Sequence, residues 1–132
     1  MRPSQEEIGE FMKLLIVDDN ASMRDLIRGL VSDLAGCIHE CGDGAQALAV
    51  YAEHRPDWVL MDVRMPEVDG IAATRQIKAD FPEANILIIT DYDDAQLRET
   101  ARLAGARAYV VKENLIGLRA VLLAESKACC PK

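Results

Sequence analysis

A short apolar run, Trp58-Val59-Leu60-Met61, ends in one carboxylate, Asp62, and constrains the fold more than any other stretch of this chain. An apolar run of this length bounded by turn signals is typical of a strand buried on both faces, as in a parallel sheet. Pro66 and Gly70 then mark a loop before the next periodic segment. Ligands of open parallel sheets bind outside the carboxyl ends of the strands, so Asp62 occupies a candidate site. Taken alone, an Asp here is more often the start of a turn, and the case for a site depends on the other strands.

Short apolar runs and segments of helical periodicity alternate along the rest of the chain. The expected strands are residues 13–17, 37–41, 58–62, 86–89 and 108–111. The expected helices cover residues 23–34, 44–54, 71–81, 97–104 and 115–122. The second strand mixes polar and apolar residues, which predicts a position at the edge of the sheet.

Local signals set the ends of several helices. Ser22 with Asp25 resembles a capping box for the first helix, and Gly36 is expected to break the same helix. Asp43 is expected to cap the second helix and Asn114 the last one. The connections are then only a few residues long, and no internal linker separates the elements.

Five strands separated by five helices predict a doubly wound α/β sandwich, a (βα)5 fold with a five-stranded parallel sheet. Right-handed crossovers on both faces require the strand order to reverse, and the flavodoxin-like order 2-1-3-4-5 places that switch between the first and third strands. A chain of 132 residues suits one core. We expect a leader over residues 1–12, one domain over residues 13–124 and a short tail over residues 125–132.

Charge and composition exclude several classes of protein. With 15 Lys plus Arg against 22 Asp plus Glu, the net charge of −7 argues against direct nucleic-acid binding. No apolar run approaches the roughly 20 residues that span a bilayer, and residues 1–11 do not resemble a signal sequence, so we expect a cytoplasmic protein without membrane contact. The four cysteines lack the spacing of a metal site. His39 and His54 are expected to be solvated surface residues.

Side chains that suit phosphate chemistry follow four of the expected strands. Asp18 and Asp19 follow the first strand, Asp62 ends the third, Thr90 follows the fourth and Lys112 follows the fifth. Three carboxylates at one edge of the sheet repel one another, and each unit of raised pKa corresponds to about 1.4 kcal/mol. Mg²⁺ is the favoured counter-ion, because it accepts a few carboxylates and keeps waters that a phosphate can replace. Lys112 and Thr90 add the point charge and the hydroxyl donor that a phosphoryl group needs.

Four segments together resemble the receiver domain of two-component response regulators. They are Leu15-Ile16-Val17-Asp18-Asp19, Met61-Asp62-Val63-Arg64-Met65-Pro66-Glu67-Val68-Asp69-Gly70, Ile89-Thr90 and Gly105-Ala106-Arg107-Ala108-Tyr109-Val110-Val111-Lys112. The resemblance covers residues 13–124, and the joint spacing of its acidic, Thr and Lys positions is highly specific. The stretch from Gly105 to Asn114 is most similar to receivers that precede a helix-turn-helix output domain. The chain is therefore expected to be a stand-alone receiver or the front half of a transcription factor.

The resemblance implies that Asp62 is the phosphoacceptor, which takes a phosphoryl group from a histidine kinase or a phosphotransfer protein. It makes the chain a signalling switch instead of an enzyme. It also implies that Asp19, Asp62 and the backbone carbonyl of Arg64 bind Mg²⁺ directly, while Asp18 acts through water. A homodimer or a complex with a protein target is the output that such a switch allows.

The same resemblance gives Thr90 and Lys112 the task of holding the phosphoryl oxygens, and makes Tyr109 the aromatic residue whose rotamer follows Thr90. Phosphorylation adds charge and acceptor oxygens, so Thr90 gains a reason to move inward and Tyr109 can turn from an exposed to a buried position. This would change the surface around the fourth helix, the fifth strand and the fifth helix. The alternative for Tyr109 is a half-buried strand residue that never moves.

Asp91 departs from the family pattern, because a small residue usually follows the Thr. The resemblance places its backbone N–H against a phosphoryl oxygen and its carboxylate at the rim of the site. The alternative is a helix cap for residues 93–104. Two other functions also remain open at this point: a receiver-like interaction scaffold that is never phosphorylated, and a Mg²⁺-dependent aspartyl phosphohydrolase.

Overall fold

The computed structural model describes residues 12–64, 69–91 and 93–129. Its strands are β1 (Met12–Val17), β2 (Ala35–Cys41), β3 (Trp58–Asp62), β4 (Ile86–Thr90) and β5 (Ala108–Val111). Its helices are α2 (Ala21–Val31), α3 (Gly44–His54), α4 (Gly70–Asp80), α5 (Ala95–Ala104), a 3-10 turn (Lys112–Asn114) and α6 (Ile116–Cys129). Residues 1–11 of the expected leader and 130–132 of the expected tail lie outside the described residues. Met12, expected in the leader, begins β1, and residues 125–129, expected in the tail, continue α6 beyond its expected end at residue 122. The fourth and fifth helices of the sequence analysis are α5 and α6.

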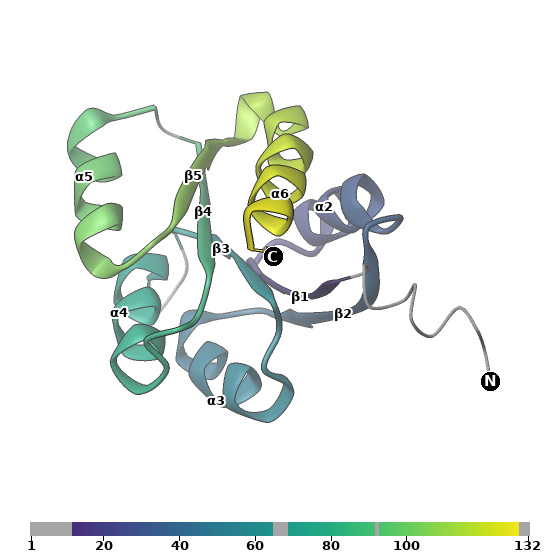
Figure 1. Cartoon of the computed structure of the whole chain (residues 1–132). Helices are drawn as coiled ribbons and strands as arrows, with labels where there is room; N and C mark the ends of the chain where they lie inside the picture. The colour runs from purple at the N-terminus through teal and green to yellow at the C-terminus, as the bar shows by residue number, and fades with distance from the viewer. Residues whose placement is uncertain (1–11, 65–68, 92, 130–132) are drawn as a thin grey trace.

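The five strands form one parallel sheet in the order β2-β1-β3-β4-β5. This confirms the flavodoxin-like order and the edge position of β2. Helices α2 and α6 cover one face of the sheet, and α3, α4 and α5 cover the other (Figure 1). The order reverses between β1 and β3, so the crevice at their carboxyl ends is the topological switch point.

Two apolar clusters hold the layers together, one on each face of the sheet. Strands β3 and β4 are buried along their whole length, because helices cover both faces. On one face, Ile27 of α2 and Leu118 of α6 are buried against the strands. On the other face, Tyr51 and Ile77 fill the same role. Each such side chain contributes about 1.5–3 kcal/mol when it is fully buried, so the central strands are held rigidly.

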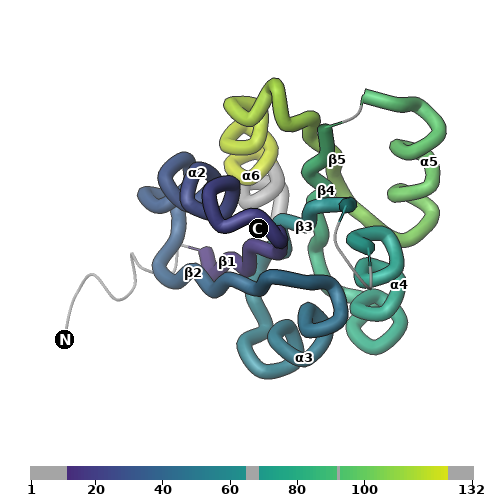
Figure 2. Tube along the Cα trace, turned by 180° about the vertical axis from the view of Figure 1, so that it is seen from behind, coloured from purple at the N-terminus to yellow at the C-terminus, as the bar shows by residue number. Residues whose placement is uncertain are grey.

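Helices α2 and α6 lie side by side on their face of the sheet (Figure 2). Arg119 of α6 joins them, because its Nη1 donates to the carbonyl of Leu30 at 2.8 Å and to Oδ1 of Asp33 at 2.6 Å. None of the helices among residues 12–64, 69–91 and 93–129 combines the length and the apolar character that a bilayer crossing requires.

The structure corrects three predicted boundaries. Asn20, and not Ser22, caps α2, since its side chain accepts a hydrogen bond from the backbone N–H of Met23 at 3.1 Å. The helix ends at Val31, so Gly36 does not break it and lies within β2. Strand pairing across the full length of β1 extends β2 backwards over that glycine.

Two further predictions about polar residues are wrong in detail. Asn114 lies in the 3-10 turn before α6 and does not directly precede the helix that it was expected to cap. His39 and His54 are partly buried and stack with ring centroids 3.6 Å apart. Burial and the charge of His54 lower the pKa of His39. The stack forms because β2 and the end of α3 are neighbours in space, which no local pattern shows.

Candidate functional site

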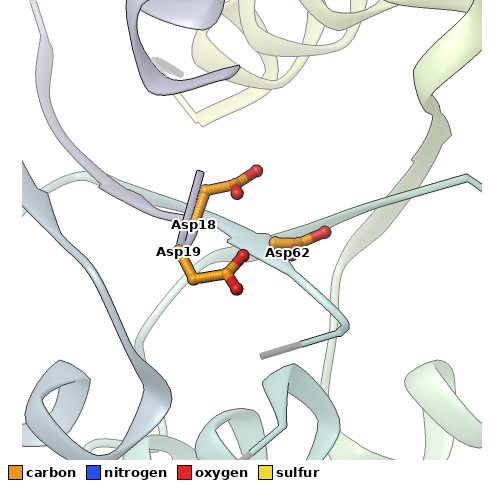
Figure 3. Close-up of side chains that lie close together, drawn as sticks. All are labelled: Asp18, Asp19 and Asp62. Atoms are coloured by element: carbon orange, nitrogen blue, oxygen red, sulfur yellow. The ribbon is translucent and has the colours of Figure 1, made fainter. Parts of the chain in front are cut away.

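The carboxyl edge of the sheet brings together the acidic residues that the sequence predicted for it. Oxygen atoms of Asp18, Asp19 and Asp62 lie within 4.8 Å of one another. Figure 3 shows Asp18 and Asp19 on the loop after β1 facing Asp62 at the end of β3. Nζ of Lys112, directly after β5, lies 3.0 Å from Oδ1 of Asp62 and 3.5 Å from Oδ2 of Asp18. Thr90 is buried at the end of β4, the strand between β3 and β5.

Burial makes this cluster electrostatically unusual. Asp18 is 1 % exposed and Asp62 is 5 % exposed, whereas Asp19 faces solvent. Loss of hydration raises the pKa of Asp62 to about 6, and the charges of Asp18 and Asp19 act in the same direction, against the hydrogen bond from Lys112. Burial alone lowers the pKa of Lys112, but Asp62, Asp18 and Asp91 outweigh it, and the pKa is raised. The cluster therefore holds more negative than positive charge.

One carboxylate oxygen of the cluster is buried without a hydrogen bond in the described part of the chain. Among the residues that the structure describes, Oδ2 of Asp18 is a buried atom without a hydrogen-bond partner. Its sister atom Oδ1 accepts the backbone N–H of Asn20 at 2.9 Å. Buried polar atoms are nearly always satisfied by a partner, a water or an ion. Together with the neighbouring carboxylates, this oxygen fits the donor set of a hard divalent cation such as Mg²⁺.

A glycine lets helix α4 begin directly against the strand that carries Asp62. A Cβ atom on Gly70 would lie 2.0 Å from the backbone carbonyl oxygen of Asp62, far inside van der Waals contact. The N–H of Gly70 donates to the carbonyl of Val63 at 2.8 Å, and Asp69 caps the helix by accepting from Ala72 at 2.8 Å. Arg64 lies exposed in the loop between β3 and α4, of which residues 65–68 are outside the described part.

Tyr109 lies apart from the acidic cluster, half-buried on β5. The guanidinium of Arg98 stands 4.3 Å above the centre of its ring, and Arg98 also forms an ion pair of 3.0 Å with Asp93. The backbone of Asp94 hydrogen-bonds the hydroxyl, although burial is the larger effect and raises the pKa of Tyr109. Arg98 and the backbone of Asp94 therefore contact this aromatic residue from the start of α5.

Asp91 is exposed directly after Thr90 and does not cap α5. The cap is Asp94, whose side chain accepts from the N–H of Gln96 at 2.9 Å, and the helix begins at Ala95. The helix-cap interpretation of Asp91 is therefore wrong. Its charge does reach the cluster, because it contributes to the raised pKa of Lys112.

The sequence analysis missed Arg24, whose Nη1 donates to the backbone carbonyl of Asp18 at 2.5 Å. Its position on α2, six residues after Asp18, was the only signal available, and a helical Arg at that distance is common on solvated surfaces. Its partner Glu40 lies on β2 and carries no local signal at all.

Comparison with known proteins agrees with the geometry. The family model described as "Response regulator receiver domain" matches residues 14–121. The chain belongs to the response regulator receiver domain family. The chemotaxis protein CheY of Bacillus subtilis (strain 168) is 41% identical over 101 residues, which cover 76% of this chain and 84% of that protein.

The transcriptional regulatory protein YhcZ of Bacillus subtilis (strain 168) is 39% identical over 104 residues, which cover 77% of this chain. The receiver domain spans only 49% of YhcZ. The crystal structure of a LuxR-family two-component response regulator from Aurantimonas sp. SI85-9A1 superposes with a TM-score of 0.78 at 32% identity, covering 87% of this chain and 86% of that one. These relatives are signalling receivers and not classical enzymes, and receiver domains typically bind Mg²⁺ at an acidic pocket.

Proposed function

We propose that this receiver domain is a cytoplasmic switch that accepts a phosphoryl group on Asp62 from a histidine kinase or a phosphotransfer protein. The observation that carries the proposal is the contact of 3.0 Å between Asp62 and Lys112 beside the carboxylates of Asp18 and Asp19. Asp62 is the member of the acidic cluster that ends the central strand β3, and it hydrogen-bonds Lys112.

The ionisation of Asp62 suits a nucleophile. Although burial raises its pKa to about 6, the carboxyl group is mainly ionised at pH 7. An Asp62 oxygen attacks phosphorus, the new O–P bond forms, and the bond from phosphorus to the donor nitrogen of the kinase breaks. Lys112 and the hydroxyl of Thr90 then hold the phosphoryl oxygens. Because Lys112 loses one anionic partner as it gains another, its charge stays paired throughout.

The same residues fit the Mg²⁺ that receiver domains use. Asp19, Asp62 and the backbone carbonyl of Arg64 would hold the ion directly, and Asp18 would act through water. The buried Oδ2 of Asp18, which lacks a hydrogen bond among the described residues, supports this assignment, as does the preference of Mg²⁺ for oxygen ligands and retained waters. When bound, the ion neutralises charge on the phosphoryl oxygens.

The output would pass through Thr90 and Tyr109. Thr90 moves toward the phosphoryl group, and Tyr109 turns inward into the space that it leaves, which changes the surface formed by α5, β5 and α6. In this chain the turn of Tyr109 would also require its cation–π contact with Arg98 to break, at about 0.5–1 kcal/mol for a partly exposed pair. The changed surface would bind a protein target or a second copy of the chain, and nucleic acid would not bind directly. Residues 13–124 are the proposed extent of the domain, between a leader and a short tail.

Intact mass spectrometry after incubation with acetyl phosphate and Mg²⁺ tests this function. One added phosphoryl group is expected, and Asp62→Asn should abolish it. Asp57→Asn is the matched control, because Asp57 stands at the opposite end of the same strand and should leave labelling unchanged. No labelling of the wild type would favour an interaction scaffold, and steady release of phosphate from many substrates would favour a phosphohydrolase. Undiminished label on Asp62→Asn would move the acceptor elsewhere.

A further inference from the structure

Arg24 joins two parts of the molecule that meet beside the acidic cluster. From α2, its Nη1 donates to the backbone carbonyl of Asp18 at 2.5 Å, and its Nε donates to Oε1 of Glu40 at 2.9 Å. Its side chain is only 21% exposed. The guanidinium is planar and presents its donors in a fixed fork, so these two bonds define its orientation.

Glu40 gives this guanidinium a fixed anchor. The carboxylate also accepts Nε of Arg28 at 2.8 Å, so two arginines of α2 hold it against β2. Arg28 is the larger cause and Arg24 the smaller one of the lowered pKa of Glu40, which therefore stays ionised. Glu40 in turn cancels much of the positive charge that Arg24 brings near the site.

The carbonyl that Arg24 holds belongs to the peptide between Asp18 and Asp19. This peptide sets the directions in which both carboxylates leave the backbone. On either side of this peptide, the N–H of Asp18 donates to the carbonyl of Cys41 at 3.1 Å, and the N–H of Asn20 donates to Oδ1 of Asp18 at 2.9 Å. Neither of these bonds is made by an atom of the peptide that joins the two acidic residues, whereas the bond from Arg24 is.

We propose that Arg24 is a positioning residue that orients the Asp18–Asp19 peptide, and with it the carboxylates that receive Mg²⁺. The inference rests on the proposed function for the identity of the cation. Glu40 acts through Arg24, and Arg28 acts only through Glu40. The edge strand β2 thereby supports a site to which it contributes no ligand.

Charge and geometry make opposite predictions for the loss of Arg24. If its charge were the important property, removing a cation beside the cluster would tighten Mg²⁺ binding. If its geometry is important, Mg²⁺ must itself order the loop, and binding weakens. Since Glu40 already offsets part of the charge of the guanidinium, we expect geometry to prevail.

Isothermal titration calorimetry of the full chain with MgCl₂ measures whether loss of Arg24 weakens or tightens Mg²⁺ binding. Arg24→Gln should raise the Kd for Mg²⁺ about tenfold, which is the range expected for loss of one charge-assisted hydrogen bond. Arg28→Gln is the matched control: it removes the same charge from the same helix and the same Glu40, without touching Asp18, and should change the Kd by less than about twofold. Arg24→Lys keeps the charge and the aliphatic stem, so it guards against misfolding. One ammonium cannot reproduce the fork, and about threefold weaker binding is expected.

Three results would overturn the inference: an unchanged Kd in Arg24→Gln, a tighter one, or equal weakening by Arg28→Gln. A merely structural role would lower the melting temperature of both arginine variants and leave their Mg²⁺ affinity alone. If the wild type binds Mg²⁺ in a manner that depends on Arg24 but is not phosphorylated on Asp62, the proposed function fails and the role of Arg24 stands. If the wild type is phosphorylated while Arg24→Gln keeps the full Mg²⁺ affinity, only the role of Arg24 fails.

Discussion

The two ends of the central sheet are built on opposite principles. At the amino end, Asp57, Lys13 and Asn85 link neighbouring strands through backbone and side-chain hydrogen bonds. Arg107 extends the chain of bonds by donating to Asn85 at 2.8 Å. The charged residues of this end are exposed. At the carboxyl end, Asp18 and Asp62 are buried with one lysine between them, and one carboxylate oxygen lacks a hydrogen-bond partner.

The difference shows where stability and function separate. Exposed charges and paired backbone groups stabilise the amino end at little electrostatic cost. The carboxyl end keeps ionised groups out of water, which destabilises the folded state until a ligand supplies positive charge. Substitutions at the two ends should therefore differ in their dependence on pH and Mg²⁺, and not only in size.

The largest expected effect is the pH dependence that Asp62 gives to the apo protein. Its pKa is about 6 when folded and 3.8 in the reference state, so the folded chain binds the proton more tightly. The stabilisation is complete below about pH 4 and is lost as pH rises through 6, a change of about 3 kcal/mol. Urea denaturation in EDTA should show this fall in wild type and not in Asp62→Asn. Asp57→Asn should retain the fall in the free energy of unfolding. If the difference in this free energy between wild type and Asp62→Asn did not change with pH, the burial account would be contradicted.

Removing Asp19 should separate the cost of the cluster from its benefit. Asp19→Asn is expected to raise the apo melting temperature by about 2 °C, because one repulsive charge disappears. It should also remove most of the Mg²⁺-dependent stabilisation, which is about 2.7 kcal/mol at 100 times the Kd. Differential scanning calorimetry with and without Mg²⁺ gives both values. Asp25→Asn makes an equal charge change on the exposed side of α2 and should change neither the apo melting temperature nor the stabilisation by Mg²⁺. If Asp19→Asn kept the full stabilisation by Mg²⁺, the ion would bind elsewhere.

A substitution at the amino end should be simpler. Asn85→Ala removes the acceptor of Arg107 and the donor to Asp57, and is expected to destabilise the chain by about 1 kcal/mol. The loss should be the same at pH 5.5 and pH 7.5 and with or without Mg²⁺, as measured by urea denaturation. A loss that changes with Mg²⁺ would show that the two ends are coupled through the strands.

The smallest expected effect is at the rim. Asp91 lies exposed beside the site, and its charge should slow the approach of an anionic donor. Asp91→Ala and Asp91→Asn should each speed labelling by acetyl phosphate about twofold at low salt, with the gain shrinking as salt rises. Asp80→Asn, an exposed charge at the far end of α4, is the control. A gain in Asp91→Ala alone would point to bulk at the entrance, and no gain in either would exclude Asp91 from the approach path.

The fold and the membership of the acidic cluster were predictable because both depend on local pattern. Apolar runs defined the strands, and topology then placed their last residues, Asp62 and Thr90, at one edge. Side-chain contacts between distant elements were not predictable. The link from Arg24 to Glu40 depends on how α2 sits against β2, and no spacing within the chain encodes that distance. The prediction of Ser22 as the cap of α2 failed for a related reason, since Asn20 and Ser22 can both accept the bond and the strand end decides between them.

Gly70 has a consequence for comparing genomes. The space for its missing side chain is occupied by the main chain of the proposed acceptor, 2.0 Å from where a Cβ would stand. Among paralogues of this chain, a replaced glycine at this position would be a marker of lost activity that is visible without inspecting the acceptor itself. A duplicate that keeps every acidic residue but carries alanine here must have shifted either the helix or the aspartyl peptide. Surveys that sort such duplicates by their carboxylates alone would miscount the working ones.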